Sequence, residues 1–393
     1  MKQHSYRDTW AEISLDAVQH NVQQFRNHIG SSTKLMAVVK ADGYGHGAVE
    51  VAQAAVHSGA DYLAVALLDE ALELRNAGIS DPILVLGYTP FRSVKKAITD
   101  GITLTVFSDD VLDEIIHQAE QLKQPVSIHI KIDSGMSRIG LTSEEEALRL
   151  AQKALNSSFV YLEGIFTHFA NADSEDPSYT RKQFTRFMAI VKLIEENNIH
   201  IPIKHCCNSA ATMNFPDMHL DMVRVGIALY GLYPGSSLKG HSIKLQQAMS
   251  LKTKIAALKT VPADQPISYG CTFIPSSDSV IATLPIGYAD GVSRLLSNRG
   301  KVLTRGQSAP IAGRVCMDQM MIDVSHVANS SIGDEVTLFG HNEGSFQSID
   351  DIASLMGTIN YEVVCLIGKR VPRVYVKEEQ QSYSTRSKEY ITL

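Results

Sequence analysis

The stretch Leu-Met-Ala-Val-Val-Lys-Ala-Asp-Gly-Tyr-Gly-His-Gly, residues 35–47, decides how the chain folds and where its chemistry lies. Its apolar residues predict a buried strand that ends at a single lysine, Lys40. Gly43, Gly45 and Gly47 then permit positive φ and a close approach of the backbone to a ligand. An amine at the end of a buried strand can have a lowered pKa and react with a carbonyl compound. The alternative interpretation is a surface lysine before a flexible turn.

Composition excludes several classes of protein. The chain has 393 residues, which predicts two domains, and its 44% hydrophobic and 20% charged residues are typical of a globular enzyme. The formal net charge of -6 gives no electrostatic footprint for nucleic acid or an anionic membrane. No apolar run approaches the ~18 residues of a membrane span, so we expect a cytoplasmic protein. The five cysteines lack the spacing of a metal site, and we expect reduced thiols and no metal.

The first part of the chain alternates short apolar runs with amphipathic stretches. The runs are continuous rather than alternating, which predicts parallel strands buried on both faces. Eight such units predict a (β/α)8 TIM barrel. A doubly wound sheet is the alternative, but the Gly-x-Gly-x-x-Gly fingerprint after its first strand is absent. The predicted strands are 35–40, 62–66, 83–87, 103–107, 126–133, 162–168, 203–208 and 222–226, and the clearest helices are 15–29, 48–57, 69–77, 109–122, 144–155 and 179–196.

A barrel places reactive side chains at the carboxyl ends of its strands. Most of the predicted strands end in such a residue, which helix capping alone does not explain. The residues are Lys40, Lys131 with Asp133 and Arg138, His168, Ser209 and Arg224.

The pattern changes after about residue 248. Short strands punctuated by Gly and Pro predict a mostly antiparallel β domain, with one helix over 350–355. The strands are expected at 251–261, 280–284, 301–304, 309–314, 320–324 and 335–339. The predicted domains are therefore a barrel over 11–243 and a β domain over 244–380 against which residues 1–10 pack, followed by a tail over 381–393.

A lysine at the mouth of a barrel can form a Schiff base with pyridoxal 5'-phosphate (PLP), and that cofactor makes further demands on the site. Tyr44, Ser209 and backbone N–H groups around Gly226 are candidates to hold its phosphate. Arg224 is a candidate partner of its pyridine nitrogen. The alternative for Arg224 is a salt bridge to Asp221 or Glu163.

Seven motifs resemble the alanine racemase family, in the same order and over residues 10 to about 376. They are AVVKADGYGHG (37–47), KIDSGMSRIG (131–140), GIFTHFA (164–170), RVGIALYG (224–231), SYG (268–270), GYADG (287–291) and GRVCMDQ (313–319). The resemblance implies a homodimer that interconverts L- and D-alanine by two-base proton transfer at Cα of a PLP external aldimine. It also implies a supply of D-alanine for peptidoglycan.

The resemblance also implies roles for individual residues. Lys40 would hold PLP and act as one base, and Tyr269 of the other subunit, bonded to His168, would be the second base. Arg138 and the partner's Met317 backbone would bind the substrate carboxylate, with Lys131 carbamylated beside Arg138. The residues expected to contact the phosphate are Tyr44, Ser209, Gly226, Ile227 and Tyr361.

Elementary chemistry agrees with two bases, because a proton must leave one face of Cα and return to the other. A tyrosine, whose reference pKa is about 10, needs stabilisation as phenolate, which Arg224 and His168 could supply. An arginine can only donate to a pyridine nitrogen and leaves it unprotonated.

Other interpretations remain open. A barrel-type PLP decarboxylase would favour an acidic residue at Arg224 and gives Tyr269 no role. A non-catalytic PLP-binding protein would resemble the barrel alone. Serine as substrate, and degradation rather than synthesis of D-alanine, also stay open.

Overall fold

A computed structural model describes residues 5–377 and 389–391. The chain divides into two compact units: one comprises Met1–Ala17, Tyr44–Gly47 and Gln247–Leu393, and the other comprises Val18–Gly43 and Ala48–Gln246. Most of the predicted tail, 381–393, lies outside the described residues.

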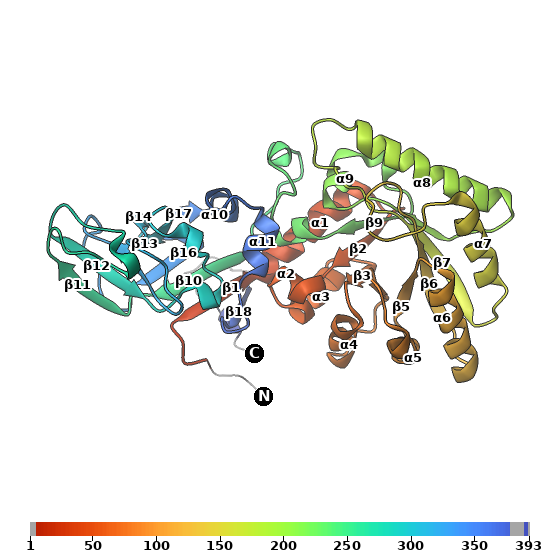
Figure 1. Cartoon of the computed structure of the whole chain (residues 1–393), viewed down its shortest axis with the longest axis horizontal. Coiled ribbons are helices and arrows are strands. Elements are labelled where there is room, and N and C mark those ends of the chain that lie inside the picture. The colour runs from red at the N-terminus through yellow and green to blue at the C-terminus, as the bar shows by residue number, and fades with distance from the viewer. Residues whose placement is uncertain (1–4, 378–388, 392–393) are drawn as a thin grey trace, which may run out of the picture. The chain divides into compact units, whose positions relative to one another are not determined.

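The second unit is a nearly closed barrel of eight parallel strands with helices on its outside, as predicted (Figure 1). Neighbouring strands follow the order β8-β7-β6-β5-β4-β3-β2-β9. Between β8 and β9, the N–H groups of Asp221 and Arg224 donate to the carbonyls of Lys204 and Cys207 at 3.1 and 3.0 Å. The strands are β2 (Lys34–Val38), β3 (Tyr62–Val65), β4 (Ile83–Val85), β5 (Thr103–Val106), β6 (Val126–Lys131), β7 (Val160–Phe166), β8 (Ile203–His205) and β9 (Met222–Val225).

Local sequence fixes where the barrel helices begin. Ser108 accepts a hydrogen bond from the N–H of Val111, and Ser143 accepts one from that of Glu146, so both residues are N-caps. No helix of the described residues is long and apolar enough to span a membrane. The helices are α1 (Leu15–Ile29), α3 (Ala48–His57), α4 (Leu68–Asn76), α5 (Phe91–Thr99), α6 (Asp109–Leu122), α7 (Glu144–Leu155), α8 (Ser178–Glu196) and α9 (Ser209–Asn214).

The other unit is a mostly antiparallel β structure, as predicted. One sheet has the order β14-β13-β16-β10-β1-β18-β19, with β17 paired to β16, and a second has the order β11-β12-β15. The pair of β1 and β18 is parallel. The elements are β1 (Thr9–Ser14), β10 (Met249–Lys254), β11 (Ala257–Val261), β12 (Ser279–Leu284), β13 (Lys301–Thr304), β14 (Gln307–Pro310), β15 (Met320–Asp323), β16 (Glu335–Asn342), β17 (Ser345–Gln347), α10 (Ile349–Met356), α11 (Asn360–Cys365), β18 (Arg373–Lys377) and β19 (Glu389–Ile391).

Three predictions in this unit are wrong in detail. The single strand expected at 251–261 is two strands, because at Ile255 the chain leaves one sheet, and the Ala256 N–H donates to Thr283 of the other. The strand expected at 309–314 is β14 at Gln307–Pro310, because Arg305 and Gly306 form a two-residue hairpin turn at positive φ. A second helix, α11, follows the expected one.

Candidate active site

Lys40 lies two residues after the end of β2, at the carboxyl end of the barrel, and begins a left-handed turn. Positive φ was expected at the glycines of this turn, but Ala41 and Asp42 also adopt it, at 52° and 54°. Such a conformation costs about 1–2 kcal/mol for each non-glycine residue. Glu70 accepts from the Ala41 N–H at 2.6 Å, and Asp42 accepts from the Ala48 N–H at 3.1 Å. These bonds hold the strained turn that carries Lys40.

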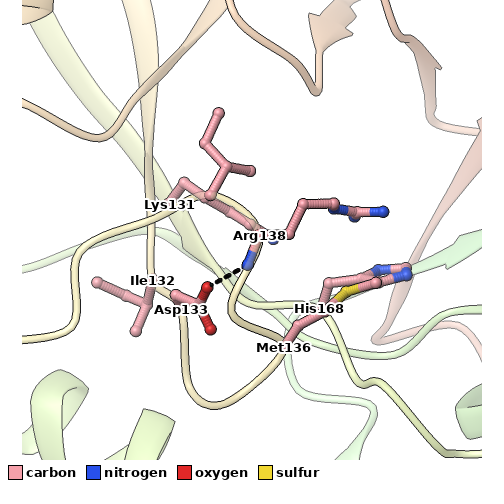
Figure 2. Close-up of a pocket in the computed structure, with 7 residues that line it drawn as sticks. Lys131, Ile132, Asp133, Met136, Arg138 and His168 are labelled. Atoms are coloured by element: carbon pink, nitrogen blue, oxygen red, sulfur yellow. Dashed lines mark hydrogen bonds between the residues drawn. The ribbon is translucent and has the colours of Figure 1, made fainter.

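The loop after β6 builds a shallow pocket with the carboxyl end of β7 (Figure 2). Asp133 accepts from the N–H groups of Gly135, Ser137 and Arg138 at 2.9, 3.0 and 2.8 Å. Burial alone would raise the pKa of Asp133, but these N–H groups lower it below its usual value. In Figure 2 the side chains of Arg138 and His168 point to the same side of the pocket. The lining residues are Lys131, Ile132, Asp133, Met136, Arg138, Ile139 and His168.

Lys131 is buried among positive charges. Burial, followed by Arg224 and Arg138, holds the pKa of Lys131 well below its usual range, and Asp133 opposes the shift. This shift favours the neutral amine, which is the nucleophilic form of a lysine. Burial and the charges of Arg224, Lys131, Arg138 and Lys40 likewise hold the pKa of His168 well below its usual range. The structure thus brings the predicted barrel residues into one electrostatic cluster.

Arg224 lies at the centre of this cluster and is 3% exposed. Its Nη2 donates to the carbonyls of Thr167 and Cys206 at 2.8 and 3.1 Å and approaches His168 Nδ1 at 3.3 Å. Its Nη1 lies 3.0 Å from His205 Nδ1. Burial lowers the pKa of Arg224 to about 10, which leaves it charged at neutral pH.

The direct salt bridge considered for Arg224 is not formed within the described residues. Asp221 is paired with Lys204, and Glu163 is paired with His129. The Nε–H of Arg224 makes no hydrogen bond to any described residue, so it can donate to a ligand.

The ends of β8 and β9 carry three of the predicted phosphate residues. The Gly226 N–H donates to Ser209 Oγ at 2.9 Å. This contact uses the Gly226 N–H inside the protein and leaves the Ser209 hydroxyl proton able to donate. The next N–H, of buried Ile227, makes no hydrogen bond within the described part of the chain.

The remaining predicted site residues belong to the β unit. Tyr44 and Tyr361 lie close together, with ring centroids 6.3 Å apart. Tyr269 is 70% exposed and Met317 is 53% exposed. Ser268, which precedes Tyr269, donates to the carbonyl of Arg314 at 2.7 Å and thereby ties the two loops together.

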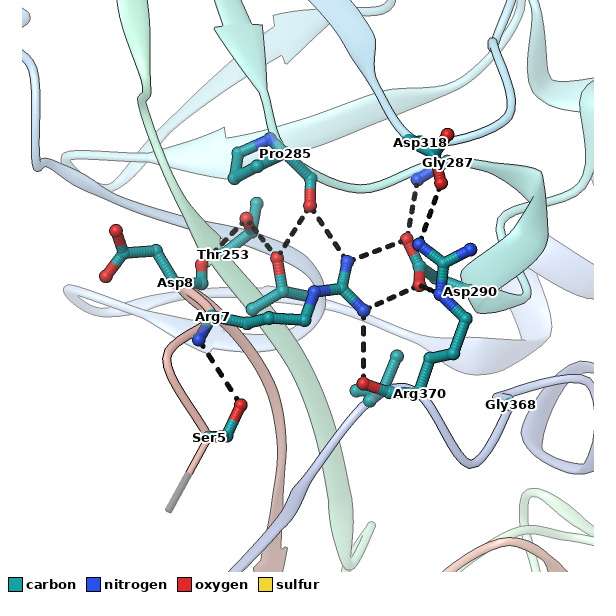
Figure 3. Close-up of polar contacts among 12 residues, drawn as sticks. Ser5, Arg7, Asp8, Thr253, Pro285, Gly287, Asp290, Asp318, Gly368 and Arg370 are labelled. Atoms are coloured by element: carbon teal, nitrogen blue, oxygen red, sulfur yellow. Dashed lines mark hydrogen bonds and ion pairs between the residues drawn. The ribbon is translucent and has the colours of Figure 1, made fainter. Parts of the chain in front are cut away.

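A buried aspartate supports the Met317 loop. The turn at Tyr288–Asp290 donates two N–H groups to this loop, from Tyr288 to Cys316 at 2.9 Å and from Ala289 to Met317 at 3.0 Å. Asp290 closes the turn by accepting from the Gly287 N–H. Both nitrogens of the Arg7 fork bind Asp290 at 2.7 and 2.9 Å, and Arg370 bridges Asp290 and Asp318 (Figure 3). Within the described residues the Met317 N–H remains without a partner.

Two family models together cover most of the chain. The family model "Alanine racemase, N-terminal domain" matches residues 13–234, and "Alanine racemase, C-terminal domain" matches residues 248–375. The chain belongs to the alanine racemase family. Membership of this family makes the chain an isomerase.

Relatives cover almost the whole chain. Alanine racemase 2 of Oceanobacillus iheyensis is 59% identical over 97% of this chain and 96% of its own length. The solved alanine racemase of Clostridium difficile 630 is 43% identical with a TM-score of 0.90, covering 95% of this chain and 97% of that one. A histidine racemase of Leuconostoc mesenteroides is 28% identical with a TM-score of 0.88, covering 96% and 100%. The fold therefore also occurs in a racemase named for another amino acid.

Several supporting residues were not predicted. Glu70 accepts from the N–H of Ala41, and Asp290 binds the side chains of Arg7 and Arg370. Only the folded structure shows partners so distant in the chain. His129 and His205 lie inside predicted strands. A histidine within a buried strand indicates a buried hydrogen bond, and this was the signal in the sequence that could have identified them.

Replacing Asp133 by Asn tests how the Arg138 loop is held. The Asn amide nitrogen cannot accept from an N–H, so we expect D133N to lose about 1–3 kcal/mol of unfolding free energy at pH 7. The depressed pKa of Asp133 stabilises the fold above the unfolded value of about 4, and this contribution is lost as pH falls through the folded value. The difference between the two proteins in urea unfolding should therefore shrink below about pH 4.

Asp176→Asn is the matched control, because Asp176 accepts from the Ser178 N–H at 2.9 Å in an exposed loop. We expect it to change the unfolding free energy by less than about 0.5 kcal/mol. Equal losses in both variants would contradict the role given to Asp133.

Proposed function

We propose that the chain binds PLP through Lys40 and interconverts L- and D-alanine, supplying D-alanine for peptidoglycan in the cytoplasm. The observation that carries this is the cluster of Lys40, Lys131, Arg138, His168 and Arg224 at one end of the barrel, in a member of the alanine racemase family. Cations that gather around a reactive lysine suit a substrate and a cofactor that are both anionic.

The donor chemistry of the site fits PLP. The Ile227 N–H and the Ser209 hydroxyl can donate to a phosphate at the ends of β8 and β9, whereas the Gly226 N–H already donates to Ser209. Tyr44 and Tyr361 are the other residues proposed to contact the phosphate. Arg224 offers Nε–H to the pyridine nitrogen and has no acceptor atom of its own. An acidic residue, which a decarboxylase of this fold would favour there, is absent at position 224.

Two bases would move the proton. When bound, PLP withdraws electrons from Cα and so lowers the barrier to removing its proton. Lys40 would take or return the proton on one face, and Tyr269 of a second subunit on the other. Arg224 donates toward His168 Nδ1, so the proton of neutral His168 lies on Nε2, where it can donate to a phenolate.

The substrate carboxylate would lie between a cation and a backbone donor. Arg138 supplies the cation, and the unused Met317 N–H of the second subunit supplies the donor. Neutral Lys131 can attack CO2, which forms an N–C bond and releases a proton. The resulting carbamate would carry a negative charge beside Arg138 and orient it.

A shared site gives a role to two exposed residues of the β unit. A catalytic tyrosine that is 70% exposed and a binding loop with Met317 53% exposed gain a function if a second copy of the chain covers them. We therefore propose a homodimer with Lys40 from one subunit and Tyr269 from the other in each site.

Racemisation in deuterated water tests the function. The PLP-loaded protein should convert L-alanine into D-alanine that carries deuterium at Cα, and faster than it converts L-serine or L-histidine. Borohydride should fix PLP to Lys40, with loss of the yellow absorbance. Label on another lysine, or a decarboxylated product, would contradict the proposal.

Mixing two inactive variants tests the shared site. Lys40→Ala and Tyr269→Phe should each be nearly inactive alone. In a mixed dimer one site carries both changes and the other carries neither, so activity should return to about a quarter to a half of the original. Crosslinking each variant before mixing should prevent this recovery. If proven mixed dimers stay inactive, Tyr269 does not act across subunits.

A third experiment tests the carbamate on Lys131. The protein in 13C-bicarbonate should show a carbamate signal that is missing in Lys131→Ala. That variant should have a raised KM for alanine and should be partly rescued by chloride or a small carboxylate. Lys204→Ala, which removes a lysine of the barrel strand β8, should keep the signal. A signal unchanged in Lys131→Ala would contradict the assignment.

A further inference from the structure

A row of polar side chains runs through the barrel interior from Arg224 to Glu163. Arg224 Nη1 lies 3.0 Å from His205 Nδ1, and His205 Nε2 lies 2.8 Å from His129 Nδ1. His129 Nε2 lies 3.1 Å from Glu163 Oε2. The four residues come from the adjacent strands β9, β8, β6 and β7, and His129 and His205 are fully buried.

The chemistry of the first residue fixes the direction of every bond. A guanidinium has no acceptor, so Arg224 must donate and His205 Nδ1 must accept. The proton of His205 then lies on Nε2 and is donated to His129 Nδ1. The proton of His129 in turn lies on Nε2 and is donated to the carboxylate. A proton on Nδ1 of His205 or of His129 would make two donors face each other.

The row also connects the buried cation Arg224 to the carboxylate of Glu163, which Arg224 does not contact directly. Burial holds the pKa of His205 well below its usual range and lowers that of His129, so both rings are neutral. Burial alone would raise the pKa of Glu163, but the hydrogen bonds from His129 and Tyr62 lower it, which keeps Glu163 ionised. The Glu163 side chain is 20% exposed, so water supports its charge at the far end of the row.

We propose that Glu163, His129 and His205 are positioning residues that form a one-way hydrogen-bond chain and hold the Arg224 guanidinium as a donor at the barrel mouth. The proposal rests on the proposed function, in which Arg224 faces the pyridine nitrogen. The chain polarises each ring toward Glu163, so the charge of Glu163 acts on Arg224 across two imidazoles. Loss of that charge should loosen the orientation of Arg224 without touching the cofactor or the substrate.

NMR of the PLP-loaded protein with [15N]histidine tests the chain directly. His129 and His205 should each show one protonated and one bare ring nitrogen, with the proton on Nε2. In Glu163→Gln the Nε2–H proton of His129 should move upfield, since its acceptor is no longer charged. The alanine kcat should fall about tenfold, as the weakening of one charged hydrogen bond predicts, with KM changed less than about twofold.

Tyr62→Phe is the matched control. Tyr62 donates to the same Glu163 oxygen at 2.8 Å but is not part of the hydrogen-bond chain. This variant should keep both imidazole patterns and a kcat within about twofold of the original protein. If Glu163→Gln folds poorly, His129→Asn is a second test. Asparagine cannot span the gap between His205 and Glu163, so this variant should show the kcat loss expected for Glu163→Gln.

Two results would contradict the proposed hydrogen-bond chain. One is a proton on Nδ1 of either ring, and the other is an equal effect of Glu163→Gln and Tyr62→Phe on kcat. The NMR pattern does not depend on turnover. If the protein shows this NMR pattern but does not racemise alanine, the proposed function is refuted and the hydrogen-bond chain is confirmed. If the protein racemises alanine but lacks the pattern, only the hydrogen-bond chain is refuted.

Discussion

A guanidinium can only donate, and in this protein that constraint organises the centre of the barrel. The backbone N–H of Arg224 donates to Cys207 between β9 and β8, where the barrel closes. Its side chain donates to Thr167 and Cys206, the residues that follow β7 and β8. One residue therefore connects three neighbouring strand ends. The backbone of this residue thus contributes to the closure of the barrel, and its side chain lies at the centre of the site.

The same constraint explains the electrostatics of the barrel mouth. Arg224 and Arg138 cannot lose their charge at neutral pH, so neighbouring groups that can titrate respond instead. Lys131 and His168 both have pKa values held well below their usual ranges. The carboxylate of Asp133 is already engaged by three backbone N–H groups and faces the loop. The cluster is thus short of negative charge, which a phosphate, a substrate carboxylate or a carbamate would each supply.

The pattern of apolar residues predicted the barrel, and the residues after its strands predicted part of the site. Eight apolar runs identified the barrel, and a reactive residue after a run identified Lys40, Lys131, His168 and Arg224 as neighbours. The spacing of residues could not show which acceptor Arg224 binds. The same sequence is compatible with a direct bond to Glu163 and with a connection through His205 and His129. The break at Ile255 was also beyond prediction, since a change of sheet depends on partners distant in the chain. The roles of Tyr269 and Met317 came from resemblance alone.

The chain handles tight backbone geometry in two ways, and the difference follows function. At Gly287 a side chain would come within 2.3 Å of the Cys316 carbonyl, so the position has no side chain and the Met317 loop packs without strain. After Lys40 the chain instead forces Ala41 and Asp42 into left-handed geometry and restrains them with Glu70. A turn of glycines would be less strained but would leave Lys40 on a freer backbone. Because Glu70 also accepts from the N–H groups of Ala66 and Leu67 at the start of α4, the orientation of Lys40 is fixed by a neighbouring β/α unit.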